Sequence, residues 1–165
     1  MKLRTRARIA VLQALYEVDV TGHPAGDVLR RRLGDVQLSP AGEAFARQLA
    51  TGVIMHRTRI NGLITEHAPE WPLDQMAVVD RNILRMAIYE LGEPAIDTPA
   101  KVAINEAVEM AKHFGSDSSP RFVNGVLGSL MADSPQPEMG EIEPLDGDWT
   151  LTPKPVTEQE EVPVA

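Results

Sequence analysis

The 165-residue chain carries 43% hydrophobic residues, no cysteine and a formal net charge of −8, which suits one domain with an ordinary core and a tail. No apolar run reaches the ~20 residues that a membrane span needs, and Glu17 and Asp19 follow the basic start too closely for a secretory signal. Without cysteine there are no disulfides and no thiolate metal sites, so we expect a cytoplasmic protein with no membrane partner.

The net charge comes entirely from one end of the chain. From Asp133 onward nine acidic residues stand against one base, Lys154, so this end carries a charge of −8 and the rest of the chain is neutral. Six of the 13 prolines also lie there. A segment of this composition buries too little apolar surface to offset its ordering entropy. We therefore expect a folded domain over residues 1–132 and a disordered acidic tail over 133–165.

The body shows helical periodicity throughout and no alternating run typical of strands. Caps, prolines and glycines punctuate it in the pattern that starts and stops helices. The predicted helices, in chain order, cover 5–20, 24–33, from Ser39-Pro40 to about 67, 77–91, from Asp97-Thr98-Pro99 to Gly115, and from Ser119-Pro120 to about Met131. With the long third stretch bent near Gly52 or Gly62, the sequence predicts an all-α fold of about seven helices.

Enzyme chemistry finds little support in the sequence. The histidines show no pairing at metal-ligand spacing: His23, His56, His67 and His113. His67 and Glu70 are three residues apart, but Pro69 interrupts any helix that would align them. The loop over 115–119 is explained by a helix stop followed by the next helix's cap, and no phosphate-binding glycine loop occurs. We expect no catalytic residue, no metal site and no cofactor.

The start of the chain is more informative, because four cations precede the first acid: Lys2, Arg4, Arg6 and Arg8. Cations at a helix N-terminus oppose the macrodipole, at a cost of about 0.3–1 kcal/mol each. Arg4 and Arg8 also share an angular position with the apolar stripe of this helix, so we expect the first turn to project beyond the core. Gln13 and Tyr16 lie near the arginines, where a phenol can stack on an unpaired base. The alternative is a solvated basic arm.

A resemblance to a known family becomes specific at 101–128, KVAINEAVEMAKHFGSDSSPRFVNGVLG. The bacterial NusB family carries a similar helix, glycine turn and FVNGVL segment. The segment 8–16, RIAVLQALY, is similar to the family's first helix, and 80–91, DRNILRMAIYEL, to its central helix. The order and spacing agree over residues 4–131, so the resemblance covers the body and leaves out the tail.

The resemblance implies two small helical bundles packed together and a transcription antitermination factor with no catalytic activity. Such factors bind the boxA element of ribosomal RNA leaders as a heterodimer with NusE, and they join the elongating RNA polymerase with other Nus factors. The family's acidic residue on the NusE surface is matched by Asp80. The family's RNA contacts are matched by Lys2, Arg4, Arg6, Arg8, Gln13, Tyr16, Arg121 and Phe122.

Several alternatives stay open at this point. Ribosomal RNA methyltransferases carry a NusB-like domain ahead of a cofactor-binding domain, whose glycine loop this sequence lacks. A pure protein adaptor would leave the basic arm solvated, and we interpret Arg30-Arg31-Arg32 as a solvated face because these side chains spread around a helix. The acidic tail could compete with RNA for the basic arm, add solubility only, or dock through Trp149 and Leu151.

Overall fold

The computed structural model describes residues 2–144 and 150–154, and within them the chain is all-α. The helices are α1 (Leu3–Thr21), α2 (Ala25–Asp35), α3 (Pro40–Met55), α4 (Arg57–His67), α5 (Val78–Gly92), α6 (Ala100–Phe114) and α7 (Ser119–Asp133), with short 3-10 turns η1 (Leu73–Gln75) and η2 (Pro94–Ile96). The predicted all-α class and helix order are confirmed. None of the helices in the described ranges is both long and apolar enough to cross a bilayer.

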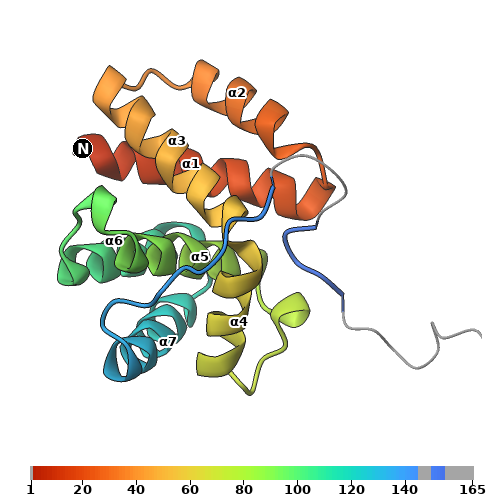
Figure 1. Cartoon of the computed structure of the whole chain (residues 1–165), viewed down its shortest axis with the longest axis vertical. Helices are drawn as coiled ribbons and strands as arrows, with labels where there is room; N and C mark the ends of the chain where they lie inside the picture. Colours follow the sequence, from red (N-terminus) through yellow and green to blue (C-terminus); the bar gives the residue numbers. More distant parts are fainter. Residues whose placement is uncertain (1, 145–149, 155–165) are drawn as a thin grey trace, which may run out of the picture.

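The helices form two packed groups, as Figure 1 shows. Helices α1, α2 and α3 pack on one another, and α4, α6 and α7 pack around α5. Helix α5 also contacts α1 and α3, so it joins the two groups. Every residue from Asp80 to Leu91 is buried. The prediction of two small bundles is confirmed, and α5 forms the centre of their shared core.

The long helical stretch after Ser39 is interrupted, but at His56 rather than near either glycine. The Ser39 hydroxyl caps α3 by accepting a 3.1 Å hydrogen bond from the backbone N–H of Gly42, as its sequence position predicts. Gly52 has a packing role instead, because a Cβ added there would overlap the ring of Tyr89. The glycine at position 52 therefore leaves space for the ring of Tyr89 and does not mark a bend in the helix.

The segment after α7 is packed against the body, so the prediction of a disordered tail over 133–165 is wrong for its described part. We call residues 134–144 and 150–154 the C-terminal strap; it runs back across α5 in Figure 1. Met139 and Leu151 are both buried in the core. Trp149, suggested above as a docking residue, lies outside the described residues.

Glu143 of the strap caps the start of α4. Its carboxylate accepts hydrogen bonds from the backbone N–H of Thr58 at 2.8 Å and from the Thr58 hydroxyl at 2.9 Å. Its own N–H donates to the carbonyl of Met55 at the end of α3, at 2.7 Å. An acid at a helix N-terminus is favourable to the dipole. The break between α3 and α4 is therefore stabilised by a residue about 85 positions away.

A buried polar network anchors the other end of the strap. Arg85 is fully buried, and all five of its N–H groups donate hydrogen bonds. Their acceptors, at 2.7–3.0 Å, are Asn61 Oδ1, Asp19 Oδ2, Asn82 Oδ1, the Leu151 carbonyl and Thr152 Oγ1. Burial lowers the pKa of Arg85 to about 10, and the nearby carboxylate of Asp19 opposes that fall. Two of the five acceptors belong to the strap, which therefore completes the core.

Candidate RNA and partner-binding surfaces

Arg8 turns inward, contrary to the expectation that the first turn of α1 projects beyond the core. It is 3% exposed, and its Nε donates a 2.9 Å hydrogen bond to Glu90 Oε1. Its guanidinium also lies over the ring of Phe45, 5.1 Å from the centroid. Burial raises the pKa of Glu90, and the charge of Arg8 opposes that rise. Because α5 supplies an acid at this point, a cation can occupy the apolar stripe, and Arg8 is not positioned to contact RNA.

Arg4 is half-buried and fastens the start of α1 to the segment before α6. Its Nη1 donates hydrogen bonds to the Ile96 carbonyl at 3.0 Å and to Thr98 Oγ1 at 3.1 Å. Lys2 is exposed and lines a shallow hollow with Arg4, Thr98 and Val102. One of the two cations at this end is therefore held by the protein, and the other faces solvent.

Arg6 and Gln13 face outward on the opposite side of α1. Both are exposed, and they line one shallow hollow together with Ile9 and Val36. Arg6 Nη2 donates a 3.1 Å hydrogen bond to the Gln37 carbonyl, and it forms no ion pair within the described ranges. The structure thus brings together two of the predicted RNA contacts and leaves the charge of Arg6 unneutralised.

Tyr16 is 45% exposed in a groove between α1 and α2. The groove also contains Arg31 and Arg32, which both pair with Glu17; Arg32 donates to Glu17 Oε1 from Nε at 3.1 Å and from Nη2 at 2.9 Å. The hydrogen bond from Arg32 is the main cause that lowers the pKa of Glu17. The side chains of the three adjacent arginines stay exposed and do not form one patch, as their spread around the helix predicts: Arg30 pairs with Asp27, whereas Glu17 gathers Arg31 and Arg32 beside Tyr16.

Arg121 and Phe122 lie in the first turn of α7, beside an aromatic residue that the sequence analysis missed. Trp71 is 54% exposed and lines a hollow with both of them, between the end of α4 and the start of α7. Its signal in the sequence is a lone tryptophan between Pro69 and Pro72. An exposed indole beside an arginine offers a stacking surface for an unpaired base.

The turn that places Arg121 and Phe122 is tight. The Ser119 hydroxyl is buried and accepts a 2.9 Å hydrogen bond from the backbone N–H of Ser116. A Cβ on Gly115 would overlap the Ser119 side chain and approach the Ala111 carbonyl to 2.8 Å. The structure therefore agrees with a helix stop at Gly115, but Ser118, the residue before α7, makes no side-chain capping hydrogen bond, so the predicted cap is wrong.

Asp80 lies in the first turn of α5, as the sequence pattern indicates, but it is only 7% exposed. Its Oδ1 is buried without a hydrogen-bond partner among the described residues. The next residue, Arg81, turns away and donates a 2.7 Å hydrogen bond to Asp19 Oδ2. A buried carboxylate oxygen without a donor is unfavourable in a free protein, so Asp80 stands out as a group that an added donor would satisfy.

Comparisons with known proteins agree with this arrangement. The profile of the NusB family matches residues 5–132. The chain belongs to the NusB family. It is 50% identical to the transcription antitermination protein NusB of Roseiflexus castenholzii over 131 residues, which are 79% of this chain and 92% of the relative. It is 50% identical over 129 residues to the protein of that name from Chloroflexus aggregans, covering 78% and 86% of the two chains.

Solved structures show the same fold. The T. maritima NusB structure superposes with a TM-score of 0.73 at 32% identity, covering 80% of this chain and 92% of that one. A crystal structure of the antitermination factors NusB and NusE in complex with dsRNA has a TM-score of 0.71 at 23% identity, covering 81% and 98%. The family match ends at residue 132, so the C-terminal strap lies beyond it.

Proposed function

We propose that this chain is a transcription antitermination factor that binds boxA-type leader RNA together with NusE. In this proposal it joins the elongating RNA polymerase indirectly, with other Nus factors, in the cytoplasm and mainly during ribosomal RNA synthesis. The support is membership in the NusB family and close similarity to curated antitermination proteins. The activity is binding and requires no catalytic residue.

The observation that carries the RNA part is the exposed Tyr16, flanked by Arg31 and Arg32 in the groove between α1 and α2. An aromatic ring stacks on a base of any sequence, and guanidinium groups bind phosphate oxygens. Arg6 and Gln13 lie closer to the N-terminus of the same helix, and Lys2 and the half-buried Arg4 line a separate hollow on its other side. A second surface contains Arg121, Phe122 and Trp71. Arg8 is left out because it is buried and paired.

The partner part of the proposal rests on Asp80. Its unpaired, nearly buried Oδ1 lacks a donor that a partner protein can supply at the start of α5. Pairing it at an interface would convert an unfavourable group into a charge-assisted hydrogen bond. A partner protein's donor would thus give a role to an acid whose Oδ1 has no hydrogen-bond partner among the described residues.

Fluorescence titration with boxA-type RNA and a scrambled RNA, with and without NusE, tests the RNA part. Arg6→Ala should weaken binding at low salt and reduce the slope of log K against log salt by about one. Tyr16→Ala should cost roughly 1–3 kcal/mol at all salt concentrations, because stacking is not screened. The matched control is Arg47→Ala, whose side chain is exposed on α3 and paired with Glu43. Equal affinity for both RNAs, or for all three variants, would contradict the proposal.

The partner interface needs a separate measurement. Asp80→Asn keeps the shape of the side chain and removes its charge, so it should weaken NusE binding about tenfold while the protein stays folded. The control is Asp27→Asn, an exposed acid on α2. If both variants bind NusE like the unmodified chain, Asp80 does not belong to the interface.

A further inference from the structure

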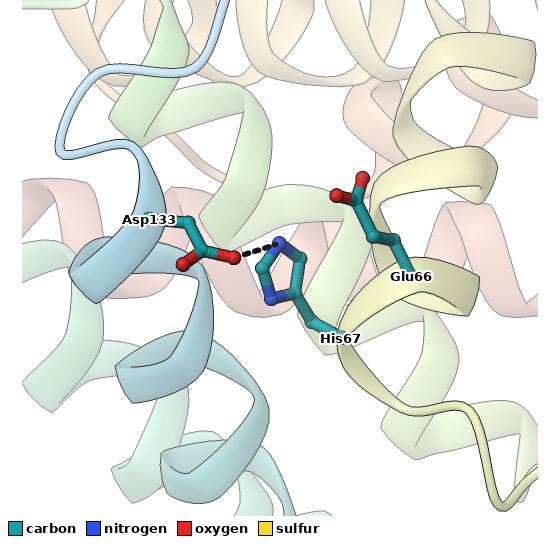
Figure 2. A group of neighbouring side chains, drawn as sticks. All are labelled: Glu66, His67 and Asp133. Atoms are coloured by element: carbon teal, nitrogen blue, oxygen red, sulfur yellow. Dashed lines mark ion pairs between the residues drawn. The ribbon is translucent and has the colours of Figure 1, made fainter.

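Three side chains with metal-binding atoms meet where α4 and α7 end. Glu66 and His67 occupy the last turn of α4, and Asp133 is the last residue of α7. One donor atom from each, a carboxylate oxygen or an imidazole nitrogen, lies within 4.8 Å of the other two. Figure 2 shows the His67 ring between the two carboxylates, with its Nε2 directed at Asp133. The spacing of 66 residues between His67 and Asp133 hides this group in the sequence.

The histidine is already oriented as a metal ligand would be. Its side chain is only 4% exposed, and its Nδ1 lies 2.9 Å from the hydroxyl oxygen of Ser129. A Nδ1–H donated to Ser129 leaves the lone pair of Nε2 facing the carboxylates. The distance from Nε2 to Asp133 Oδ2 is 3.7 Å, too long for a hydrogen bond. The buried ring therefore presents to the group a nitrogen that makes no hydrogen bond among the described residues and only the longer contact with Asp133.

The local charge favours a cation at the same point. The C-termini of two helices meet here, and each carries a partial negative charge. Glu66 and Asp133 add two carboxylates at the ends where acids are unfavourable, and neither pairs with a lysine or arginine among the described residues. Both carboxylates are on exposed residues, so they can move toward a bound ion. Negative charge without a cation in this arrangement is a cost that a metal ion would remove.

We propose that Glu66, His67 and Asp133 form a binding site for a divalent transition-metal ion such as Zn²⁺. One imidazole nitrogen and two carboxylate oxygens are a donor set that suits Zn²⁺ and related ions better than Ca²⁺ or Mg²⁺, which take oxygen ligands. Bonds of about 2.0–2.2 Å place tetrahedral ligands roughly 3.5 Å apart, so the side chains need to close by about an ångström. The ion fastens the end of α7, where the C-terminal strap begins, to the end of α4.

The test uses the full chain, freed of metal by chelation, with Zn²⁺ alone as the probe. Calorimetry should give one ion per chain with a micromolar Kd, and a Zn²⁺ concentration of a hundred times Kd should raise the Tm by roughly 5–10 °C. Asp133→Asn and Glu66→Gln, both at exposed positions, should each weaken Zn²⁺ binding at least tenfold without lowering the Tm of the metal-free protein. Glu70→Gln, a neighbouring exposed acid, is the matched control and should bind like the unmodified chain.

A second readout distinguishes the site from others on the chain. Co²⁺ bound to the unmodified protein should show a visible absorption band that disappears in His67→Gln and persists in His113→Gln. Absence of 1:1 Zn²⁺ binding below about 100 µM, or full binding by Asp133→Asn and Glu66→Gln, overturns the proposal. Equal binding of Mg²⁺ and Zn²⁺ overturns it as well, because it would reduce the site to a diffuse negative patch.

Discussion

Two buried arginines show how differently this chain neutralises charge within the helical body and at the contact between the body and the C-terminal strap. Arg8, in α1, is paired with Glu90 and lies near Glu106, so all its acidic partners belong to the helical body. Arg85, in α5, pairs with Asp19 but gives both Nη2 hydrogen bonds to Leu151 and Thr152 of the C-terminal strap. The first pair lies wholly inside the family match over 5–132, and the second depends on a segment outside it.

The difference teaches that a family domain can be extended by adding to its core rather than to its surface. The strap satisfies donors of Arg85, places Leu151 in the core and caps α4 with Glu143. A buried guanidinium with unmet donors is costly, so the strap and this network form one unit. Arg8 needs no such addition. The comparison predicts that the two arginines respond differently when the strap is removed.

The largest expected effect comes from removing either arginine. Arg8→Ala leaves the buried Glu90 without its hydrogen-bonded cation, and Arg85→Ala leaves Asp19 with Arg81 as its remaining cationic partner among the described residues. Each substitution should lower the free energy of unfolding by about 3–5 kcal/mol. Urea unfolding followed by circular dichroism measures both. A loss below about 1 kcal/mol for either variant would contradict the burial described for it.

Removal of residues 134–165 should have the next largest effect and lower the free energy of unfolding by roughly 2–4 kcal/mol. Without the strap, two N–H groups of Arg85 lose their acceptors and the core loses the contacts of Leu151. The matched control removes only 155–165 and keeps the whole C-terminal strap. In the form that lacks residues 134–165, Arg85→Ala should lower the free energy of unfolding by less than it does in the full chain. Arg8→Ala should lower it by the same amount in both forms. Equal costs of both substitutions in the two backgrounds would make the strap independent of the network.

Gly92, at the end of α5, provides a finer test of the strap. A Cβ there would lie 2.5 Å from Met139 Cε and 2.6 Å from the Pro137 carbonyl, so Gly92→Ala should displace the start of the strap and cost about 1–2 kcal/mol. Without residues 134–165 the same substitution should be neutral or stabilise the helix by up to about 1 kcal/mol. A destabilisation of the same size in both forms would show that Gly92 serves α5 itself.

The smallest effect is a difference in pH dependence between the two networks. The pKa of Glu90 is raised above 4.5 by burial, so its contribution to stability is present below pH 4.5 and is lost as pH rises through the higher folded value. Burial also opposes ionisation of Asp19, but Arg81 and Arg85 outweigh it and lower its pKa below 3.8. Its contribution is present above pH 3.8 and is lost as pH falls through the lower folded value.

Unfolding of Glu90→Gln and Asp19→Asn between pH 2.5 and 7 measures these opposite trends. Relative to Glu90→Gln, the unmodified chain should gain stability on acidification from pH 7 toward 4.5. Relative to Asp19→Asn, it should lose stability below pH 3.8. The same direction of change in both comparisons would contradict the assignment of the two carboxylates.

The helices and the family could be predicted from the sequence because both depend on local signals. Periodicity, Ser39 as a cap and the glycine at position 115 place the elements, and the stretch 101–128 carries the resemblance. The same local signals do not report partners far along the chain. Arg6, Gln13 and Tyr16 are exposed, and their role in RNA binding stays a prediction; Trp71 lies beside Arg121 and Phe122, which a lone aromatic in the sequence does not reveal.

By itself, then, the sequence determined the all-α class, the order of the helices and the membership in the NusB family, since each rests on neighbours within a few turns of helix. Only the tertiary structure decided which charged groups are buried. Glu90 draws Arg8 into the core, Arg85 holds the strap, and the ends of α4 and α7 bring His67 to Asp133. The physical reason is that burying a charge is costly unless an opposite charge or a hydrogen-bonding group meets it, and the groups that meet Arg8 and Arg85 come mostly from distant segments.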